Sequence, residues 1–211
     1  MNLEQTIRAV QQALGIEVDG KAGPQTWAAI HRRVVGGGDA GGAQPAPAPM
    51  VESLPQAPVD ERSEKVIATL LPEVRPYARA LVHKAAASGI QIKVISGHRS
   101  YAEQDALYAR GRTVQPGPIV TNARGGYSNH NFGIAFDIGV FEGSRYLGES
   151  PKYRAVGMLG SEIGLEWGGN WKDLVDQPHF QLRPAWASDL SGRELLAALR
   201  QRVADGSPVF A

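Results

Sequence analysis

Ten residues, 128–137, constrain this chain more than any other stretch, because they combine an imidazole and a carboxylate with a run of small residues. The second half of the stretch alternates apolar and small side chains, which is typical of a β-strand with one buried face. His130 precedes Asp137 by seven positions, and an odd offset along a continuous strand directs two side chains to opposite faces. If both bind one metal ion, the chain must leave strand geometry between them. Gly133 is the expected place, because glycine tolerates unusual backbone angles.

The composition restricts the chemistry and the partners of such a site. With 211 residues, the chain is long enough for one domain with a sizeable core and a small additional module. It has no cysteine, so a zinc ion would be held by histidine and carboxylate side chains. The formal net charge of +1 gives no electrostatic case for binding nucleic acid or an anionic membrane. No apolar stretch is long enough for membrane insertion, and the first residues lack the pattern of a secretory signal peptide.

The chain is expected to contain a small helical module, a linker and a larger domain. In the module, residues 1–35, the spacing of residues 3–14 predicts an amphipathic helix, and Pro24 is placed to begin a second helix. Residues 36–62 are rich in glycine, alanine and proline and predict a linker, which leaves residues 63–211 as a separate domain. Two short helices bury little surface alone, so a helical hairpin docked on the main domain is the alternative to an independent module.

Residues 63–211 predict a domain of class α+β, because helical and strand patterns are mixed without a repeating strand-helix-strand order. Helical patterns occur at residues 66–71, 74–85, 101–110, 152–163 and 191–204. Strand patterns occur at residues 91–96, 133–139, 165–167 and 179–182. Residues 112–129 have no clear periodicity, and a loop of that length in a compact domain is expected to frame a cleft.

A second pair of residues extends the candidate metal site. His179 follows Asp176 by three positions. Like His130 and Asp137, this pair combines an imidazole with a carboxylate. Two imidazoles and one carboxylate leave a fourth tetrahedral position for water, which suits a catalytic zinc ion. Asp176 would then be a general base that stays off the metal and close to its water.

These residues carry a resemblance to zinc peptidases that include VanY-type D-Ala-D-Ala carboxypeptidases and phage L-alanyl-D-glutamate endolysins. The principal motifs are Ser128-x-His130-x-x-Gly133-x-Ala135-x-Asp137 and Asp176-x-x-His179. Further matches, closest to the endopeptidase branch, are Ser96-Gly97-His98-Arg99-Ser100, Gln104, Gly111-Arg112-Thr113, Thr121-Asn122-Ala123 and Glu166-Trp167-Gly168-Gly169. The resemblance spans about residues 90–182. It implies a small mixed or antiparallel sheet flanked by helices, as in D,D-peptidase and hedgehog-like folds. Residues 1–35 resemble the small helical peptidoglycan-binding module of cell-wall hydrolases.

The resemblance also implies roles for individual residues. His130, Asp137 and His179 would be the ligands of one zinc ion, and Asp176 the catalytic acid/base. Arg99 would act in catalysis and substrate binding, because a guanidinium can clamp a substrate carboxylate or a developing oxyanion with two charge-assisted hydrogen bonds. The alternative for Arg99 is a structural ion pair with a carboxylate of the protein.

Three other residues are weaker candidates for substrate contact. His98 lies next to Arg99, and Ser128 opens the first motif, where its hydroxyl could orient the site through a hydrogen bond to a ligand. Trp171 is either a wall of the cleft or a core residue, whereas Trp167 is expected in the core.

By this resemblance the chain would be a zinc metallopeptidase that hydrolyses the L-Ala-D-Glu bond of the peptidoglycan stem peptide, as in endolysin-like cell-wall degradation and bacteriolysis. The alternatives are a D-Ala-D-Ala carboxypeptidase and a non-catalytic peptidoglycan-binding protein. Peptidoglycan is the expected partner, and the protein is expected to be a monomer. It would act on the cell wall or in the periplasm after synthesis in the cytoplasm and release through a holin-type pore.

Overall fold

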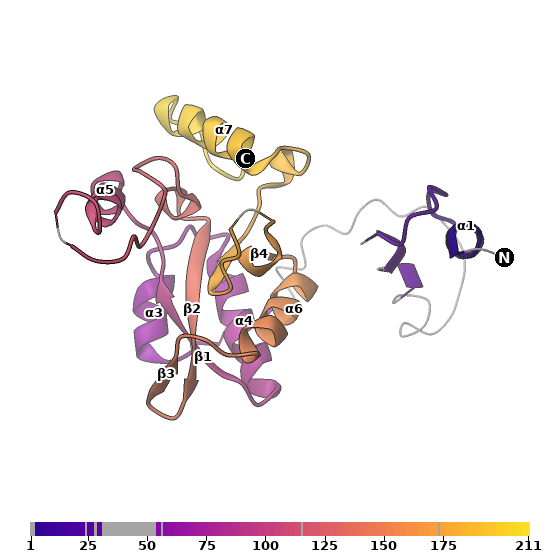
Figure 1. The fold of residues 1–211 in the computed structure, drawn as a ribbon, viewed down its shortest axis with the longest axis horizontal. Helices are drawn as coiled ribbons and strands as arrows, with labels where there is room; N and C mark the ends of the chain where they lie inside the picture. The colour runs from indigo at the N-terminus through magenta and orange to yellow at the C-terminus, as the bar shows by residue number, and fades with distance from the viewer. Residues whose placement is uncertain are drawn as a thin grey trace. The chain divides into compact units, whose positions relative to one another are not determined.

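The chain divides into two compact units, Met1–Ala48 and Pro49–Ala211. The computed structural model describes residues 3–23, 25–27, 29–30, 54–55, 57–114, 116–172 and 174–211. Figure 1 shows the two units as a ribbon, with labels on the principal helices and on strands β1 to β4. No helix among these residues is long and apolar enough to cross a membrane.

The first unit is organised around a buried polar side chain. Its helix α1 (Leu3–Ala13) confirms the amphipathic pattern and carries Gln11, which is only 2% exposed. The Gln11 amide donates to Asp19 Oδ1 (2.6 Å) and to Thr26 Oγ1 (2.9 Å), and its oxygen accepts from the Gly20 backbone N–H (2.8 Å). These bonds tie the helix to the turn and to the chain that follows it, so they give the described part of the first unit a defined shape.

The second unit begins earlier in the chain than the sequence predicts. Most of the predicted linker lies outside the described residues, but Leu54 is 7% exposed and packs in the core of the second unit. Helix α3 (Glu61–Ile67) starts inside the predicted linker, because the Asp60 carboxylate accepts from the Ser63 backbone N–H (3.1 Å) and caps the helix. Residues before 63 therefore also pack in the second unit.

One antiparallel sheet of five strands forms the centre of the second unit. The strands are β1 (Gln91–Ser96), β2 (Ala135–Glu142), β3 (Arg145–Leu147), β4 (Glu166–Trp167) and β5 (His179–Gln181). Their order is β1-β2-β5-β4, and β3 pairs with the far end of β2 through a short hairpin. The sheet confirms every predicted strand, whereas β3 has three residues and was not predicted.

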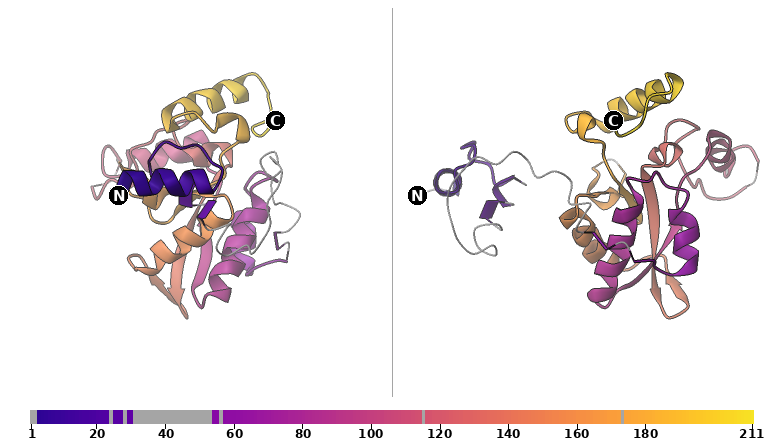
Figure 2. Two further views of the ribbon diagram at one scale, coloured as in Figure 1. Left: turned by 90° about the vertical axis from the view of Figure 1, so that its right-hand side faces the viewer. Right: turned by 180° about the vertical axis from the view of Figure 1, so that it is seen from behind.

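Helices α3, α4 (Arg75–Ala87) and α6 (Lys152–Glu162) gather around one half of the sheet, and α5 (Tyr101–Ala109) and α7 (Gly192–Ala204) lie at its other end (Figure 1 and Figure 2). The predicted helix at 66–71 is only partly correct, because α3 ends at Ile67 and the next residues form turns. The remaining helices agree with their sequence patterns, and the class is α+β as predicted.

The largest apolar cluster lies between the sheet and helices α3, α4 and α6. Phe136 and Ile138 of β2 are fully buried in it, so Asp137 between them belongs to the opposite face of the strand. Helix α6 approaches the sheet closely because it has glycine at two contact positions. A Cβ on Gly157 would lie 2.3 Å from the Trp167 ring. The core thus fixes β2 and leaves its other face free for chemistry.

Candidate metal centre

Three chain segments bring His130, Asp137 and His179 together. Asp137 in β2 and His179 in β5 are partners in the antiparallel ladder. His130 lies on the 3-10 helix η2 (Asn129–Phe132), which ends at Gly133 with φ at 67°. This left-handed residue turns the chain into β2, so His130 reaches the same face as Asp137 despite the odd offset. The predicted break at Gly133 is confirmed.

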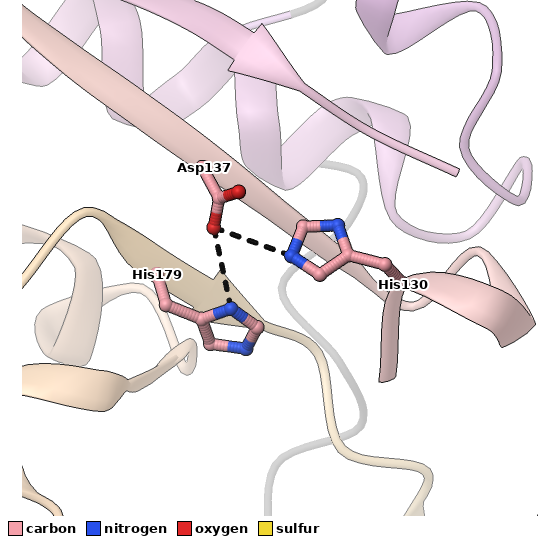
Figure 3. Close-up of side chains that lie close together, drawn as sticks. All are labelled: His130, Asp137 and His179. Atoms are coloured by element: carbon pink, nitrogen blue, oxygen red, sulfur yellow. Dashed lines mark hydrogen bonds and ion pairs between the residues drawn. The ribbon is translucent and has the colours of Figure 1, made fainter. Parts of the chain in front are cut away.

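The three side chains have the spacing of ligands around one cation. Asp137 Oδ1 lies 3.2 Å from His130 Nε2 and 3.3 Å from His179 Nδ1. Dashed lines mark these two contacts in Figure 3. One ligand atom from each residue lies within 4.8 Å of the others. Tetrahedral ligands at the usual distances from zinc are about 3.3 Å apart. The two distances from Asp137 to the histidine nitrogens therefore already match the spacing of ligands around such an ion.

Hydrogen bonds on the outer side of each ring leave the inner nitrogen free. His130 Nδ1 lies 2.7 Å from the Gly97 carbonyl oxygen, which can only accept, so Nδ1 donates and Nε2 keeps its lone pair. His179 Nε2 lies 3.0 Å from Gln181 Oε1, so Nε2 donates there and Nδ1 is the nitrogen that faces Asp137. In their neutral forms both rings thus turn an acceptor nitrogen toward the centre of the trio.

Arg99 holds the outer oxygen of the carboxylate. Its Nη2 donates to Asp137 Oδ2 (3.3 Å) and to Ser96 Oγ (3.1 Å), and its Nη1 donates to Gln104 Oε1 (2.8 Å). Gln104 is fully buried and donates in turn to the Ala123 carbonyl (2.9 Å) in the long loop. The ion pair considered for Arg99 therefore exists, and its partner is a candidate metal ligand.

The surroundings of Asp137 favour the ionised form of its carboxylate. Burial opposes ionisation of this carboxylate, but the neighbouring His130 and His179 rings and their hydrogen bonds hold its pKa well below its usual range. Burial also disfavours a charged His179, yet the Asp137 carboxylate raises the pKa of that imidazole above its usual value. A partly buried anion flanked by two imidazoles is an arrangement that favours a bound cation.

A cavity of about 1000 Å³ opens over the trio. Of the residues predicted for substrate and catalysis, Arg99, Ser128, Trp171 and Asp176 line this cavity. The Trp171 ring lies 4.8 Å from the ring of His179, centroid to centroid, so Trp171 is a wall of the cavity. The Ser128 backbone N–H donates to Asn131 Oδ1 (3.3 Å) at the start of η2.

Asp176 lies beside the trio but outside it. The half-buried carboxylate has no hydrogen-bond partner among the described side chains, and burial together with the Asp137 charge raises its pKa. Its backbone is fixed, because its N–H donates to the Gly168 carbonyl (3.1 Å) and its carbonyl accepts from the His179 N–H (3.2 Å). A Cβ on Gly168 would lie 2.6 Å from the Asp176 carbonyl oxygen, which explains the glycine in that motif.

Two predictions about neighbouring residues have different outcomes. Trp167 is 6% exposed and packs in the core as predicted. His98 is exposed and is not among the residues that line the cavity, since the chain turns there and its backbone N–H donates to Thr69 Oγ1 (3.1 Å). The structure therefore gives no support to a substrate contact by His98.

Sequence reasoning missed several residues of the cavity. Gln181 could have been found, because it lies two positions after His179 on one strand and therefore shares its face. Lys172 and Arg193 also line the cavity. Arg193 belongs to α7, which packing brings to the site from a distant part of the chain, so no local pattern pointed to it.

Comparisons with known proteins show similarity to cell-wall enzymes. Residues 121–182 match the family model described as D-alanyl-D-alanine carboxypeptidase, and residues 2–30 match a putative peptidoglycan binding domain. The peptidoglycan L-alanyl-D-glutamate endopeptidase CwlK of Bacillus subtilis is 39% identical over 127 residues, which cover 54% of this chain and 74% of that protein.

Two solved structures also resemble the chain. The L-Ala D-Glu endopeptidase ChiX of Serratia marcescens is 25% identical, with a TM-score of 0.42 over 58% of this chain and 86% of that one. A mutant of the vancomycin resistance D,D-pentapeptidase VanY, from a VanB-type cassette and in complex with Zn(II), is 16% identical. Its TM-score is 0.44 over 66% of this chain and 81% of that one.

Proposed function

Because this chain belongs to the family of cell-wall peptidases that includes D-alanyl-D-alanine carboxypeptidases and L-alanyl-D-glutamate endopeptidases, we propose that it is a zinc-dependent peptidoglycan endopeptidase. The bond cleaved is the one between L-Ala and D-Glu in the stem peptide. One observation carries the proposal: His130, Asp137 and His179 converge in a cavity that also holds Asp176, in a chain 39% identical to an endopeptidase of that specificity.

The donor set suits zinc. Two imidazole nitrogens and one carboxylate oxygen are ligands that zinc accepts in catalytic sites, where a fourth position stays open to water or substrate. A zinc ion held by His130, Asp137 and His179 supplies a Lewis acid that polarises a carbonyl group and makes water more acidic. The outer hydrogen bonds of both rings support this assignment, since they leave one free nitrogen on each ring.

Asp176 and Arg99 perform the remaining steps in this proposal. The Asp176 carboxylate accepts a proton from the attacking water and passes it to the leaving amine of D-Glu, which balances the hydrolysis. Arg99 uses three donors on Asp137, Ser96 and Gln104, and a guanidinium has five N–H groups. The donors that remain can bind the substrate carboxylate or the developing oxyanion at the cavity wall.

Removal of the metal tests the proposal. Chelation is expected to abolish cleavage of purified peptidoglycan, and zinc is expected to restore it, because the remaining residues supply no substitute Lewis acid. Mass spectrometry of the released fragments should show a new free amine on D-Glu and a new carboxyl group on L-Ala. Activity that survives complete metal removal would contradict the zinc assignment.

A D-Ala-D-Ala carboxypeptidase is the second candidate, because the family model that matches residues 121–182 carries that description. The same fragment analysis separates the two activities. Release of free D-Ala from pentapeptide stems, with the L-Ala-D-Glu bond intact, would favour the carboxypeptidase and overturn the endopeptidase. A non-catalytic binding protein would release neither product, and the convergence of the three ligands with Asp176 argues against it.

We also propose that residues 1–35 bind peptidoglycan and tether the catalytic domain to the wall. The match of residues 2–30 to a peptidoglycan-binding domain and the division of the chain after Ala48 support this role. A tether raises the local concentration of the enzyme at an insoluble substrate. We propose that the enzyme acts as a monomer, since the three candidate ligands, Asp176 and Arg99 already meet at one cavity within a single copy of the chain. A single species of about the mass of one chain in light scattering would agree.

Deletion of residues 1–48 is expected to weaken binding to insoluble peptidoglycan, by on the order of 10²-fold if the two units bind together. Cleavage of a small soluble stem peptide should remain unchanged, since the cavity lies within the second unit. Gln11→Ala should reproduce the loss, because Gln11 is buried and holds the first unit together, whereas Gln12→Ala at an exposed position is the matched control. A folded deletion variant without peptide cleavage would contradict the separation of roles.

A further inference from the structure

A chain of hydrogen bonds runs from the candidate metal site into the neighbouring strand. His179 Nε2 lies 3.0 Å from Gln181 Oε1, and Gln181 Nε2 donates to Glu166 Oε2 over 2.9 Å. Gln181 is 1% exposed and His179 is 5% exposed, so water does not compete for these bonds. The strands hold the geometry, because Glu166 and Gln181 are partners in the ladder between β4 and β5.

The Glu166 carboxylate at the outer end decides which group donates and which accepts in each of these hydrogen bonds. An ionised carboxylate only accepts hydrogen bonds, so the Gln181 amide must turn its NH₂ group toward Glu166. Its oxygen then faces His179, and the imidazole must donate from Nε2. The Asn129 side chain donates to the same Gln181 oxygen, which agrees with this orientation.

Glu166 is well placed to stay ionised. Burial opposes its ionisation, but hydrogen bonds from Trp171 and Arg183 hold the pKa of the carboxyl below its usual value. Trp171 Nε1 donates to Oε1 (3.0 Å) and Arg183 Nε donates to Oε2 (3.0 Å). With Gln181, three donors therefore converge on the two oxygens of Glu166.

We propose that Glu166, acting through Gln181, is a positioning residue that fixes His179 in the Nε2–H tautomer and so reserves Nδ1 for the metal. The inference rests on the proposed function for the identity of the metal as zinc. Glu166 also places Trp171, whose ring stands 4.8 Å from that of His179. One carboxylate thus sets both the tautomer of a ligand and the position of the adjoining wall.

This role differs from that of a general base. The oxygens of Glu166 are already engaged by three donors, whereas Asp176 has no such partner among the described side chains. It also differs from that of an ordinary surface ion pair. Glu142 provides the comparison, because its carboxylate pairs with Arg145 and Lys152 on the exposed end of β2, outside the cavity.

The first test compares Glu166→Gln with the matched control Glu142→Gln. A glutamine at position 166 presents one NH₂ group, so one of the three donors loses its acceptor and Gln181 is free to turn around. Zinc affinity, measured by competition with a chromogenic chelator, is expected to fall about 10-fold to 100-fold in Glu166→Gln and to stay unchanged in Glu142→Gln. Equal affinity of Glu166→Gln and the unchanged protein would overturn the inference.

The second test exchanges the two side chains. In the double variant Glu166→Gln with Gln181→Glu, the carboxylate at position 181 can again only accept from His179 Nε2–H, and the amide at position 166 donates to it. Zinc affinity is expected to return to within a few-fold of the original. A merely structural role of Glu166 predicts no such rescue, so a double variant as weak as the single one would overturn the proposal.

The third measurement reports the tautomer itself. Long-range ¹H–¹⁵N spectra of the metal-free protein, recorded at a pH above the raised pKa of His179, should show the neutral ring protonated at Nε2 in the unchanged protein and in the double variant. Glu166→Gln should show a mixture, and an unaltered tautomer there would overturn the inference. If Glu166→Gln does not fold, Gln181→Met removes the acceptor with little change in volume and serves for the same comparison.

Failure of the inference and failure of the proposed function give different results. If the unchanged protein binds no zinc, the proposed function is wrong, and the tautomer spectra still decide whether Glu166 positions His179. If the unchanged protein binds zinc and Glu166→Gln binds it equally well, only the positioning role is wrong.

Discussion

A His179→Ala variant is expected to lose bound zinc and, with it, peptidoglycan cleavage. Structural zinc sites with four protein ligands bind with apparent free energies of about 10–16 kcal/mol, or roughly 3 kcal/mol per ligand. Loss of one ligand should therefore weaken zinc affinity on the order of 10²-fold. The remaining Asp137 and His130 cannot compensate, because their ligand atoms already meet at 3.2 Å on one side of the site.

Metal analysis after dialysis measures this effect directly. His83→Ala is the matched control, since His83 lies on α4, where its Nε2 hydrogen bonds with the Ala57 carbonyl oxygen (2.9 Å), and it does not line the cavity. This control should keep its zinc and its activity. A folded His179→Ala protein with full zinc content would remove His179 from the ligand set and leave the assignment of the site without support.

Most of the metal-ligand set could be predicted, because these residues lie close together in the sequence. His130, Gly133 and Asp137 lie within one short stretch, and the physical requirement for a glycine follows from the odd offset between the two ligands. The structure has that glycine at φ 67°. His179 joins them because β5 pairs with β2 in register with Asp137. The motif therefore predicted His179 as a ligand, but the pairing of β5 with β2 is seen only in the structure.

The role of Arg99 could not be decided from the sequence, because a substrate clamp and an ion pair both place arginine near a carboxylate. The answer depends on the register of β1 against β2. Ser96 is the partner of Asp137, after an irregularity in the ladder beyond Val94, and this register carries the following loop to the ligand. Such a shift is a property of the assembled sheet, so no local pattern predicts it.

Other elements were missed for similar reasons. Strand β3 has only three residues, two of them exposed, so its pattern is too short to distinguish from a turn. Leu54 lies after a stretch of alanine and proline that reads as a linker, and only its packing in the core shows that it belongs to the domain. Composition describes segments, whereas single anchoring contacts decide where a domain starts.

Asp176→Asn is expected to keep its zinc and its fold and to lose on the order of 10²-fold to 10⁴-fold in turnover, the usual contribution of general acid-base catalysis. Asparagine has nearly the same size but cannot accept a proton at this position. The backbone that holds residue 176 is unaffected, because the bonds to Gly168 and His179 involve main-chain atoms only.

The expected signature of Asp176→Asn is a lower kcat with little change in KM, since a proton acceptor acts in the transition state more than in substrate binding. Asp189→Asn, at an exposed position that does not line the cavity, is the matched control and should change neither constant. Loss of zinc from Asp176→Asn would make Asp176 a ligand. Near-normal turnover would mean that another group accepts the proton. Glu166 is a poor substitute for it, because three donors already engage the Glu166 carboxylate, so its replacement should weaken zinc binding first.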